Sequence, residues 1–278
     1  MIVVDDGSTD ATVAIAEGRE GVTTLRQRSQ GPGAARNLGA AWAGGEVFAF
    51  TDADCVPAPS WLREGVAATA GAELVQGAVR PDPAVPRMPF DRTVWVAREG
   101  GLYECASLFV DRELFERIGG FEDWLGATMG KQLAEDAWLG WRARRAGART
   151  AFSDAAIVHH AVFRRGVRGY ALERMRLVYF PAIVRKMPEL RGELLYGRWF
   201  LSRRTASFDA ALVGAIGSLA SSSPLPLALV VPYAVSLGRA AVPWGRHAPR
   251  AAIGELLADA VGFGALVAGG VRSRTAVL

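Results

Sequence analysis

The chain has 278 residues, half of them hydrophobic, which excludes a disordered or fibrous protein because a sizeable core can be buried. Its two cysteines, Cys55 and Cys105, are too few for a disulfide scaffold or a cysteine metal cluster and favour a reducing compartment. The net charge of +4 is divided unevenly, with −6 on residues 1–158 and +10 on residues 159–278. This division indicates a polyanionic partner for the second part, either an anionic membrane surface or nucleic acid.

Short apolar runs alternate with helix-type patterns along the first part of the chain. The patterns predict strands at 2–4, 22–25 and 47–51, and helices at 11–17, 34–43 and from residue 60. A later helix is predicted at 135–146, with Gly147 after it, and two strand segments, 150–152 and 156–158, are expected to flank a turn. Alternating strands and helices are typical of an α/β domain with a mostly parallel sheet flanked by helices. Ligands of such sheets bind outside the carboxyl ends of the strands.

The composition becomes more apolar toward the C-terminal end. Residues 210–238 carry no charge, and this run exceeds the ~20 residues that a helix needs to span a bilayer. The interruption SSSPLP at 221–226 leaves two possibilities, one kinked span or two short segments of a re-entrant hairpin. A second apolar segment at 251–271 is weakened as a span by Glu255 and Asp259. The alternative is a helical subdomain with a very apolar core.

The stretch between these two parts is strongly basic. Residues 159–204 hold 11 basic and 3 acidic side chains, which suits the surface of an anionic membrane. Nucleic acid is not expected as a partner, because the aromatic residues there lack a stacking pattern. The predicted organisation is therefore a domain at 1–165, a basic helical connector at 166–206 and membrane-associated hydrophobic helices at 207–278.

Two acidic motifs come directly after predicted strands. Asp52 and Asp54 are alternate residues that can both direct carboxylates at one divalent cation, and Mg²⁺ and Mn²⁺ favour such oxygen ligands. Asp5 and Asp6 open the motif DDGSTD, whose carboxylates can accept hydrogen bonds from ribose hydroxyls or a base N–H. The alternative for DDGSTD is a turn followed by a helix N-cap that includes Ser8.

Two further motifs lie at predicted helix starts. The glycine-rich segment GPGAARNLG at 31–39 enters a helix whose N-terminus attracts anions, but it fits neither a Walker loop nor a dinucleotide-binding pattern. Glu135 and Asp136 open another helix, where the helix dipole helps to keep a carboxylate ionised. An ionised carboxylate that faces a cleft is a candidate general base, and the alternative is ordinary acidity in a first helical turn.

The order of these motifs resembles the family 2 glycosyltransferases over about residues 1–165. The resemblance rests on DDGSTD, the Ala-Arg-Asn motif within 31–39, Asp52-Ala53-Asp54, the segment IGGFED at 118–123, and Glu135-Asp136 with its following helix. It implies the GT-A fold and an inverting transfer from a nucleotide-diphosphate sugar, usually a UDP-sugar. We expect the acceptor to be a saccharide, lipid-linked or part of the cell envelope, with the protein at the cell membrane and its catalytic domain in the cytoplasm.

The same resemblance implies roles for individual residues. Asp136 is the expected catalytic base, supported by Glu135, and Asp54 is the expected principal ligand of Mg²⁺ or Mn²⁺, with Asp52 and His160 as further metal candidates. Arg164 and Arg165 lie where family members often close a loop over the diphosphate, although a basic face against lipid headgroups explains them equally well. Donor-binding roles fall on Asp5, Asp6, Ser8, Gly33, Arg36, Asn37, Asp52, Arg164 and Arg165.

The sequence departs from the family pattern in two places. The family normally has a strand and a helix before the DDGS strand, and this missing strand is expected in the middle of the sheet. The Gln-x-x-Arg-Trp signature of processive synthases is not evident, which favours transfer of single sugars. We therefore keep an alternative, an inactive truncated GT-A relic that serves as a membrane-bound nucleotide-sugar binding or scaffold protein.

Overall fold

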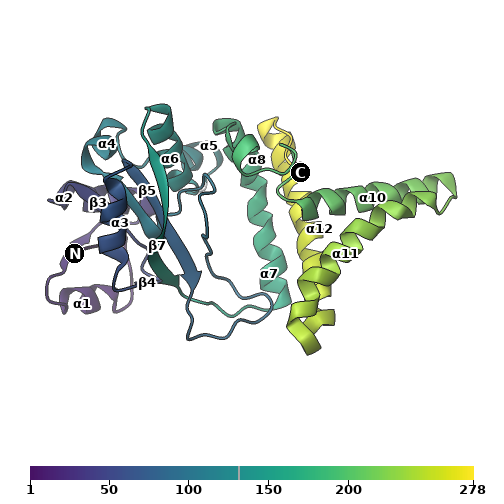
Figure 1. Cartoon of the computed structure of the whole chain (residues 1–278), viewed down its shortest axis with the longest axis horizontal. Helices are drawn as coiled ribbons and strands as arrows, with labels where there is room; N and C mark the ends of the chain where they lie inside the picture. The colour runs from purple at the N-terminus through teal and green to yellow at the C-terminus, as the bar shows by residue number, and fades with distance from the viewer. Residues whose placement is uncertain (131) are drawn as a thin grey trace. The chain divides into compact units, whose positions relative to one another are not determined.

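The chain divides into two units, coloured purple to teal and teal to yellow along the sequence (Figure 1). The structure, a computed structural model, describes residues 1–130 and 132–278. The first unit comprises Met1–Asp82 and Val94–Ala161, and the second comprises Pro83–Thr93 and Val162–Leu278. The connector predicted at 166–206 and the helices predicted at 207–278 thus lie together in the second unit. The charge division follows the units, with net −7 on the first and net +11 on the second.

The first unit contains two sheets. β1 (Ile2–Asp5) and β2 (Thr23–Arg26) form a parallel pair. The larger sheet has the order β3 (Val47–Phe50), β6 (Leu108–Asp111), β5 (Leu74–Pro81), β7 (Thr150–His160), β4 (Cys55–Pro57). Only β5 and β7 are parallel in it, and the other three pairings are antiparallel. The sheet is therefore mixed, as expected, but the prediction that it is mostly parallel is wrong.

Successive side chains of the central strands point to opposite faces of the sheet, and each face has its own hydrophobic core. Leu74 and Val75 of β5 are both fully buried, and they contribute to different clusters because successive side chains point to opposite faces. One face packs against Ala40, Leu114 and Leu139, and the other packs against Trp61. The helices that supply these residues cover the two faces (Figure 1). In the first unit the helices are α1 (Thr12–Glu17), α2 (Pro32–Trp42), α3 (Trp61–Thr69), α4 (Arg112–Arg117), α5 (Trp124–Met129), α6 (Glu135–Arg145) and the 3-10 turn Cys105–Ser107.

The predicted turn near residue 154 is instead part of a strand. β7 runs without interruption from Thr150 to His160, and its pairing with β5 shifts register between Gly77 and Ala78. A bulge absorbs extra residues while the ladder continues on both sides, which explains why the sequence there looks like a turn. The long strand carries His160 to the β4 edge of the sheet.

The second unit is helical. Its helices are α7 (Val167–Glu173), α8 (Phe180–Lys186), α9 (Leu190–Glu193), α10 (Arg203–Ser221), α11 (Val230–Ala241) and α12 (Ala248–Ser273), with 3-10 segments at Arg174–Tyr179, Leu225–Leu229 and Val242–His247. The buried residues of α12 include small ones at regular spacing, such as Gly254, Ala258, Gly262 and Gly269. These small side chains let neighbouring elements approach closely, so α12 is the central helix of this unit.

Glu255 and Asp259, the two acids within the predicted apolar segment 251–271, have ion-pair partners. Arg204 of α10 forms ion pairs with Glu255 at 2.8 Å and with Asp259 at 2.6 Å, both on α12. The hydroxyl of Tyr233 on α11 donates to the same Asp259 oxygen at 2.8 Å. Three helices are therefore joined at one buried polar cluster, and the charges of α12 are compensated inside the unit.

One helical stretch among the described residues, Leu225–Ser273, is long and apolar enough to cross a membrane, judged by length and composition. Its most apolar part is 28% buried, so most of that part is not covered by the rest of the chain. Gly245 has φ 52° and ψ −119°, which breaks the helical geometry between α11 and α12. The stretch is thus two helices joined at a kink, and it is a candidate for membrane association.

Candidate active site

Asp5 and Asp6 lie at the carboxyl end of β1. Asp5 is 3% exposed, and its Oδ1 accepts the backbone N–H of Ser8 at 3.1 Å. Hydrogen bonding from Ser8, its side chain first and its backbone N–H second, lowers the pKa of Asp5 although burial opposes it, and the charge of Arg26 makes a smaller contribution in the same direction. The other oxygen, Oδ2, is buried and has no hydrogen-bond partner among the described residues. Arg26 lies 3.8 Å from Oδ2, an ion pair that is too long for a hydrogen bond.

Asp6 holds a loop. Its Oδ1 accepts from the side chain of Gln27 at 2.7 Å and from the backbone N–H of Gln30 at 2.8 Å, and its Oδ2 accepts from the N–H of Gly31 at 2.8 Å. Burial raises the pKa of Asp6, but these hydrogen bonds outweigh it and the pKa is lowered. Gly31 has φ 93°, a left-handed conformation that suits glycine, directly before α2 begins. Asp6 thereby fixes the glycine-rich entrance of α2.

The first turns of α2 pack against the segment before α6. A Cβ on Gly33 would lie 3.3 Å from side-chain carbons of both Glu135 and Phe121, so a small residue is required for this approach. The Asn37 side chain donates to the carbonyl of Phe121 at 2.8 Å and accepts from its N–H at 2.8 Å. Both Asn37 groups are thus engaged within the protein. A recess lies beside them, lined by Gln30, Pro32, Gly33, Ala34, Asn37, Phe121, Asp123, Gln132 and Glu135.

Arg36 joins two of the predicted acidic motifs. One guanidinium nitrogen lies 2.8 Å from Asp52 Oδ1 and another lies 3.0 Å from Glu135 Oε1. Burial by itself would lower the pKa of Arg36, yet the surrounding negative groups raise it, so the side chain stays a cation. Residues from α2, the end of β3 and the start of α6 are in this way brought to one place. Asp52 forms an ion pair with Arg36, and its role as a metal ligand stays a prediction.

Asp136 is half-buried at the start of α6. Its pKa is raised to about 7, first by burial and second by the neighbouring charge of Glu135. The N–H of Ala137 donates to its Oδ1 at 2.7 Å, and Arg36 also favours its ionised form, but both are weaker than burial. A carboxyl group with this pKa exchanges a proton near neutral pH, which is the property required of a general base. Ala134, the residue directly before α6, has φ 63°, an uncommon conformation for a residue with a Cβ.

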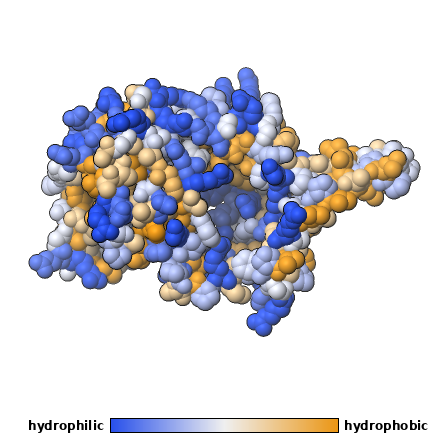
Figure 2. Space-filling view, in the orientation of Figure 1, coloured by the Kyte–Doolittle hydropathy of each residue, from blue (hydrophilic) through white to orange (hydrophobic). Residues whose placement is uncertain are grey.

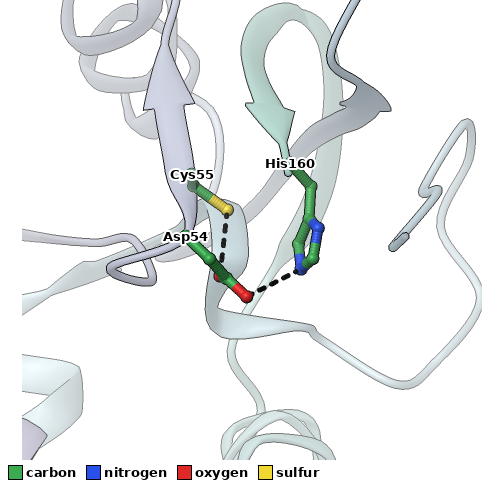
Figure 3. Close-up of side chains that lie close together, drawn as sticks. All are labelled: Asp54, Cys55 and His160. Carbon is green, nitrogen blue, oxygen red and sulfur yellow. Dashed lines mark hydrogen bonds and ion pairs between the residues drawn. The ribbon is translucent and has the colours of Figure 1, made fainter. Parts of the chain in front are cut away.

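Asp54 lies beside His160 at the paired ends of β4 and β7 (Figure 3). His160 is buried, and its Nε2 is 3.4 Å from Asp54 Oδ2. Its Nδ1 lies 2.7 Å from the carbonyl oxygen of Ala161, which only accepts, so Nδ1 carries a hydrogen and Nε2 is the ring nitrogen that faces Asp54. Cys55 contributes a thiol 4.0 Å from the other Asp54 oxygen. A carboxylate, an imidazole and a thiol thus converge within 4.8 Å.

These three groups fit a divalent cation. The Nδ1 of His160 is engaged by a backbone carbonyl, the usual outer partner of a metal-ligating histidine, and its Nε2 is the nitrogen that can bind a cation together with Asp54. The carboxylate and imidazole suit Mn²⁺, while the thiol is a softer ligand. Asp54 and His160 were both predicted as metal ligands and lie together. Asp52 lies outside this three-residue group.

The two predicted diphosphate-binding arginines belong to the second unit. Arg164 lies 2.6 Å from Asp91, and its other nitrogen donates to the carbonyl of Pro86 at 2.7 Å. Arg165 pairs with Glu173 and donates to the carbonyl of Phe90 at 3.0 Å. Both guanidinium groups therefore have partners within the second unit, and their contact with a diphosphate stays a prediction.

Two groups were missed by the sequence reasoning. Cys55 becomes visible only through the register of β4 with β7, which pairs it with His160 across about a hundred residues of chain. Glu104 is a further carboxyl group whose charge raises the pKa of Asp136, and burial raises the pKa of Glu104 itself. The only sequence signal for Cys55 is its place next to Asp54, and Glu104 has no motif around it.

Known proteins resemble this chain in sequence and in fold. Residues 1–87 match the model of glycosyl transferase family 2. Glycosyltransferase AglE of Haloferax volcanii is 32% identical over 142 residues, which cover 45% of this chain and 46% of AglE. The alignment thus spans less than half of that relative.

A solved structure with a similar fold is the mannosyltransferase PcManGT from Pyrobaculum calidifontis in complex with GDP-Man and Mn²⁺. It is 22% identical, with a TM-score of 0.63 over 98% of this chain and 77% of that one. The sequence matches and the shared fold agree with the order of motifs along β1, α2, β3 and α6. Residues 1–87 are therefore similar to glycosyl transferase family 2, and the chain has the GT-A fold.

Proposed function

We propose that the protein transfers a sugar from a nucleotide-diphosphate sugar to an acceptor hydroxyl with inversion, and that Asp136 is the general base. The observation that carries this proposal is the Asp136 carboxyl at the start of α6, whose pKa is raised to about 7 beside the Arg36–Glu135 ion pair. An ionised Asp136 accepts the hydroxyl proton as the acceptor oxygen attacks the anomeric carbon. Arg36 and Glu135 position that carboxylate and keep a cation beside it.

The metal is assigned to the group around Asp54, at the paired ends of β4 and β7. Asp54 and His160 would hold Mg²⁺ or Mn²⁺, with Cys55 adjacent, and the cation would neutralise the charge that grows on the leaving diphosphate. PcManGT, with which the chain shares its fold, was solved with GDP-Man and Mn²⁺. This supports a nucleotide-sugar donor and a divalent metal here.

The nucleotide end of the donor is assigned to the edge beyond β1. The buried Oδ2 of Asp5 lies 3.8 Å from Arg26 and accepts no hydrogen bond from the described residues, which suits a donor group on the base or ribose. Asp6 supports this site by fixing the loop at Gln30 and Gly31. The N-terminus of α2, with Gly33, lies in the same region. UDP-sugar remains the expected donor class, and GDP-sugar is the alternative that PcManGT suggests.

The acceptor is proposed to be a lipid-linked or cell-envelope saccharide. The support is the second unit, which carries the candidate membrane helix and a net charge of +11. A protein held at an anionic membrane would present its catalytic unit on the cytoplasmic side, where nucleotide sugars are made.

The replacement Asp136→Asn tests the base assignment. Purified full-length protein is incubated with Mn²⁺ and a panel of UDP- and GDP-sugars, and release of nucleoside diphosphate is measured with and without acceptor extracts. We expect turnover to fall by about 10²–10⁴, the usual contribution of a general base, while donor affinity stays within a factor of about three. Asp154→Asn, which removes an exposed carboxylate from β7, is the matched control and should retain full turnover. Unchanged turnover of Asp136→Asn refutes the base assignment.

A further inference from the structure

The helices α10 and α11 of the second unit form a hairpin with an uncovered apolar surface. Residues 210–238 hold no charged side chain. Large aliphatic side chains along the hairpin are exposed, among them Val213, Ile216, Leu219, Leu225 and Val231, with Leu219 84% and Leu225 81% exposed. The hydropathy surface shows hydrophobic residues along this hairpin as it projects away from α12 (Figure 2). A surface of this kind needs a partner, because exposed aliphatic patches of this extent are unusual in water.

Several polar groups at the tip of the hairpin are hydrogen-bonded within the tip. Ser218 donates to the carbonyl of Ser223 at 2.7 Å, and Ser221 donates to the carbonyl of Gly217 at 2.7 Å. The N–H of Leu225 donates to the Ser223 hydroxyl at 3.3 Å, and the two prolines of the turn have no N–H to satisfy. Unpaired backbone groups are the main obstacle to placing a turn in hydrocarbon. These hydrogen bonds of Ser218, Ser221 and Leu225 lower the cost of placing the turn in lipid.

The hairpin is also preformed. A Cβ on Gly214 would lie 2.5 Å from the carbonyl oxygen of Pro226, so α10 and the turn are in close contact. At the base, the rings of Phe208 and Tyr233 pack edge to face with centroids 5.1 Å apart. Arg204 anchors the same base to α12 through its two ion pairs. The apolar surface is thus held by internal packing and needs no partner to fold.

The length of the uncharged part determines how far it can enter a bilayer. From Asp209 to the end of α10 there are twelve uncharged residues, about 18 Å at 1.5 Å per residue. The hydrocarbon core is about 30 Å thick, so even when this arm is fully immersed its tip ends near the middle of the bilayer and far from the other surface. Charged residues bound the hairpin on both arms, Asp209 on α10 and Arg239 on α11.

The charge of the unit selects the kind of membrane. The second unit has 18 basic and 7 acidic side chains, which attract an anionic lipid surface. We propose that the hairpin of α10 and α11 inserts its tip into a single leaflet of an anionic bilayer and anchors the protein without spanning it. This inference deepens the membrane association within the proposed function. It does not depend on the sugar transfer, since it concerns residues outside the catalytic unit.

Vesicle flotation of the full-length protein tests the insertion. The vesicles are phosphatidylcholine with a quarter phosphatidylglycerol, and the variant is the double replacement Leu219→Asp and Leu225→Asp. Because a carboxylate in the hydrocarbon is costly, we expect the variant to bind at least about tenfold more weakly than the wild type. Val271→Asp is the matched control, since Val271 is 76% exposed on α12, and it should bind within about twofold of the wild type.

Three results would overturn the proposal. They are a wild-type protein that does not float, a tip variant that binds as the wild type does, or a control variant that loses binding equally. A wild-type dimer in solution that the tip variant converts to a monomer, without flotation of either, would assign the surface to a second copy of the chain. Activity with a soluble acceptor analogue is measured in parallel, so loss of membrane binding is distinguished from loss of catalysis.

The depth is measured with Leu219→Cys and a membrane-impermeant maleimide. We expect no labelling above the wild-type background of Cys55 and Cys105, whether the reagent is outside the vesicles or trapped inside, until detergent is added. Labelling by trapped reagent would indicate a full span, and labelling from outside would indicate a tip that stays in water. Either result contradicts insertion into one leaflet.

Discussion

Arg36 is the residue on which the arrangement of the acidic motifs depends. It was predicted as a donor contact, but its guanidinium is shared between Asp52 and Glu135 and is mostly shielded from water. The positive charge of Arg36 compensates the carboxylate of Glu135, which is the residue next to Asp136. Motif spacing identified the members of the cluster, and only the folded chain shows that Arg36 contacts Asp52 and Glu135.

Asp136 carries a pH signature that can be measured without substrate. Its pKa is raised from 3.8 to about 7, so the folded state holds a proton that the unfolded chain has released, and folding stability falls as the pH rises through this interval. The Asp136→Asn side chain does not ionise, so this replacement removes the fall in folding stability with rising pH. We expect its free energy of unfolding to equal the wild-type value near pH 4 and to exceed it by about 2–4 kcal/mol at pH 8.

Denaturant titrations of both proteins at several pH values check this expectation in the absence of metal. Asp154→Asn should show no gain that grows with pH, because its side chain is exposed. If the free energies of unfolding of the wild type and Asp136→Asn differ by a constant amount between pH 4 and pH 8, the pKa of Asp136 is not raised in the folded protein. The same ionisation requires turnover to rise with pH through about 7, since the ionised carboxylate is the base.

At the scale of elements, the sequence predicted what depends on local pattern. The strands β1, β2 and β3 and the helices α2 and α6 lie within a few residues of their expected positions, and Gly147 follows α6 with φ 84° as expected. β5 and β6 were not predicted, because Gln76 and Gly77 interrupt the apolar run of β5 and β6 is a short strand. Their antiparallel pairing is a property of the tertiary fold that local patterns do not encode.

The seating of α3 on the sheet can be tested through one glycine. A Cβ on Gly65 would lie 2.0 Å from the ring of Phe109 on β6, a contact too close for any side chain without displacement of the helix. We expect Gly65→Ala to lower the free energy of unfolding by about 1–3 kcal/mol, the usual cost of overpacking, despite the better helix propensity of alanine.

Gly71→Ala is the control for this replacement. Its Cβ would have a nearest neighbour at 3.9 Å, an ordinary van der Waals contact, and a change within about 0.5 kcal/mol is expected. Thermal unfolding followed by circular dichroism compares the two variants. Equal stability of Gly65→Ala and the wild type would mean that α3 is not packed on Phe109 in this way.

At the scale of the whole molecule, charge and chemistry are divided between the two units. The acidic first unit holds the acid cluster and the Asp54–His160 pair, and the basic second unit holds the apolar hairpin. Composition alone predicted this division, because it depends only on counting charged residues along the chain. The mode of membrane contact was left open between a kinked span and a re-entrant hairpin, since it depends on which apolar faces are packed inside the unit.

Calorimetric titration of UDP- and GDP-sugars into the purified protein shows whether the first unit binds a nucleotide sugar through a metal at Asp54. We predict saturable binding of at least one donor in Mn²⁺, weakened at least about tenfold by EDTA or by Asp54→Asn and unchanged by Asp154→Asn. Absence of binding to every donor, or binding that is indifferent to both EDTA and Asp54→Asn, would contradict the account.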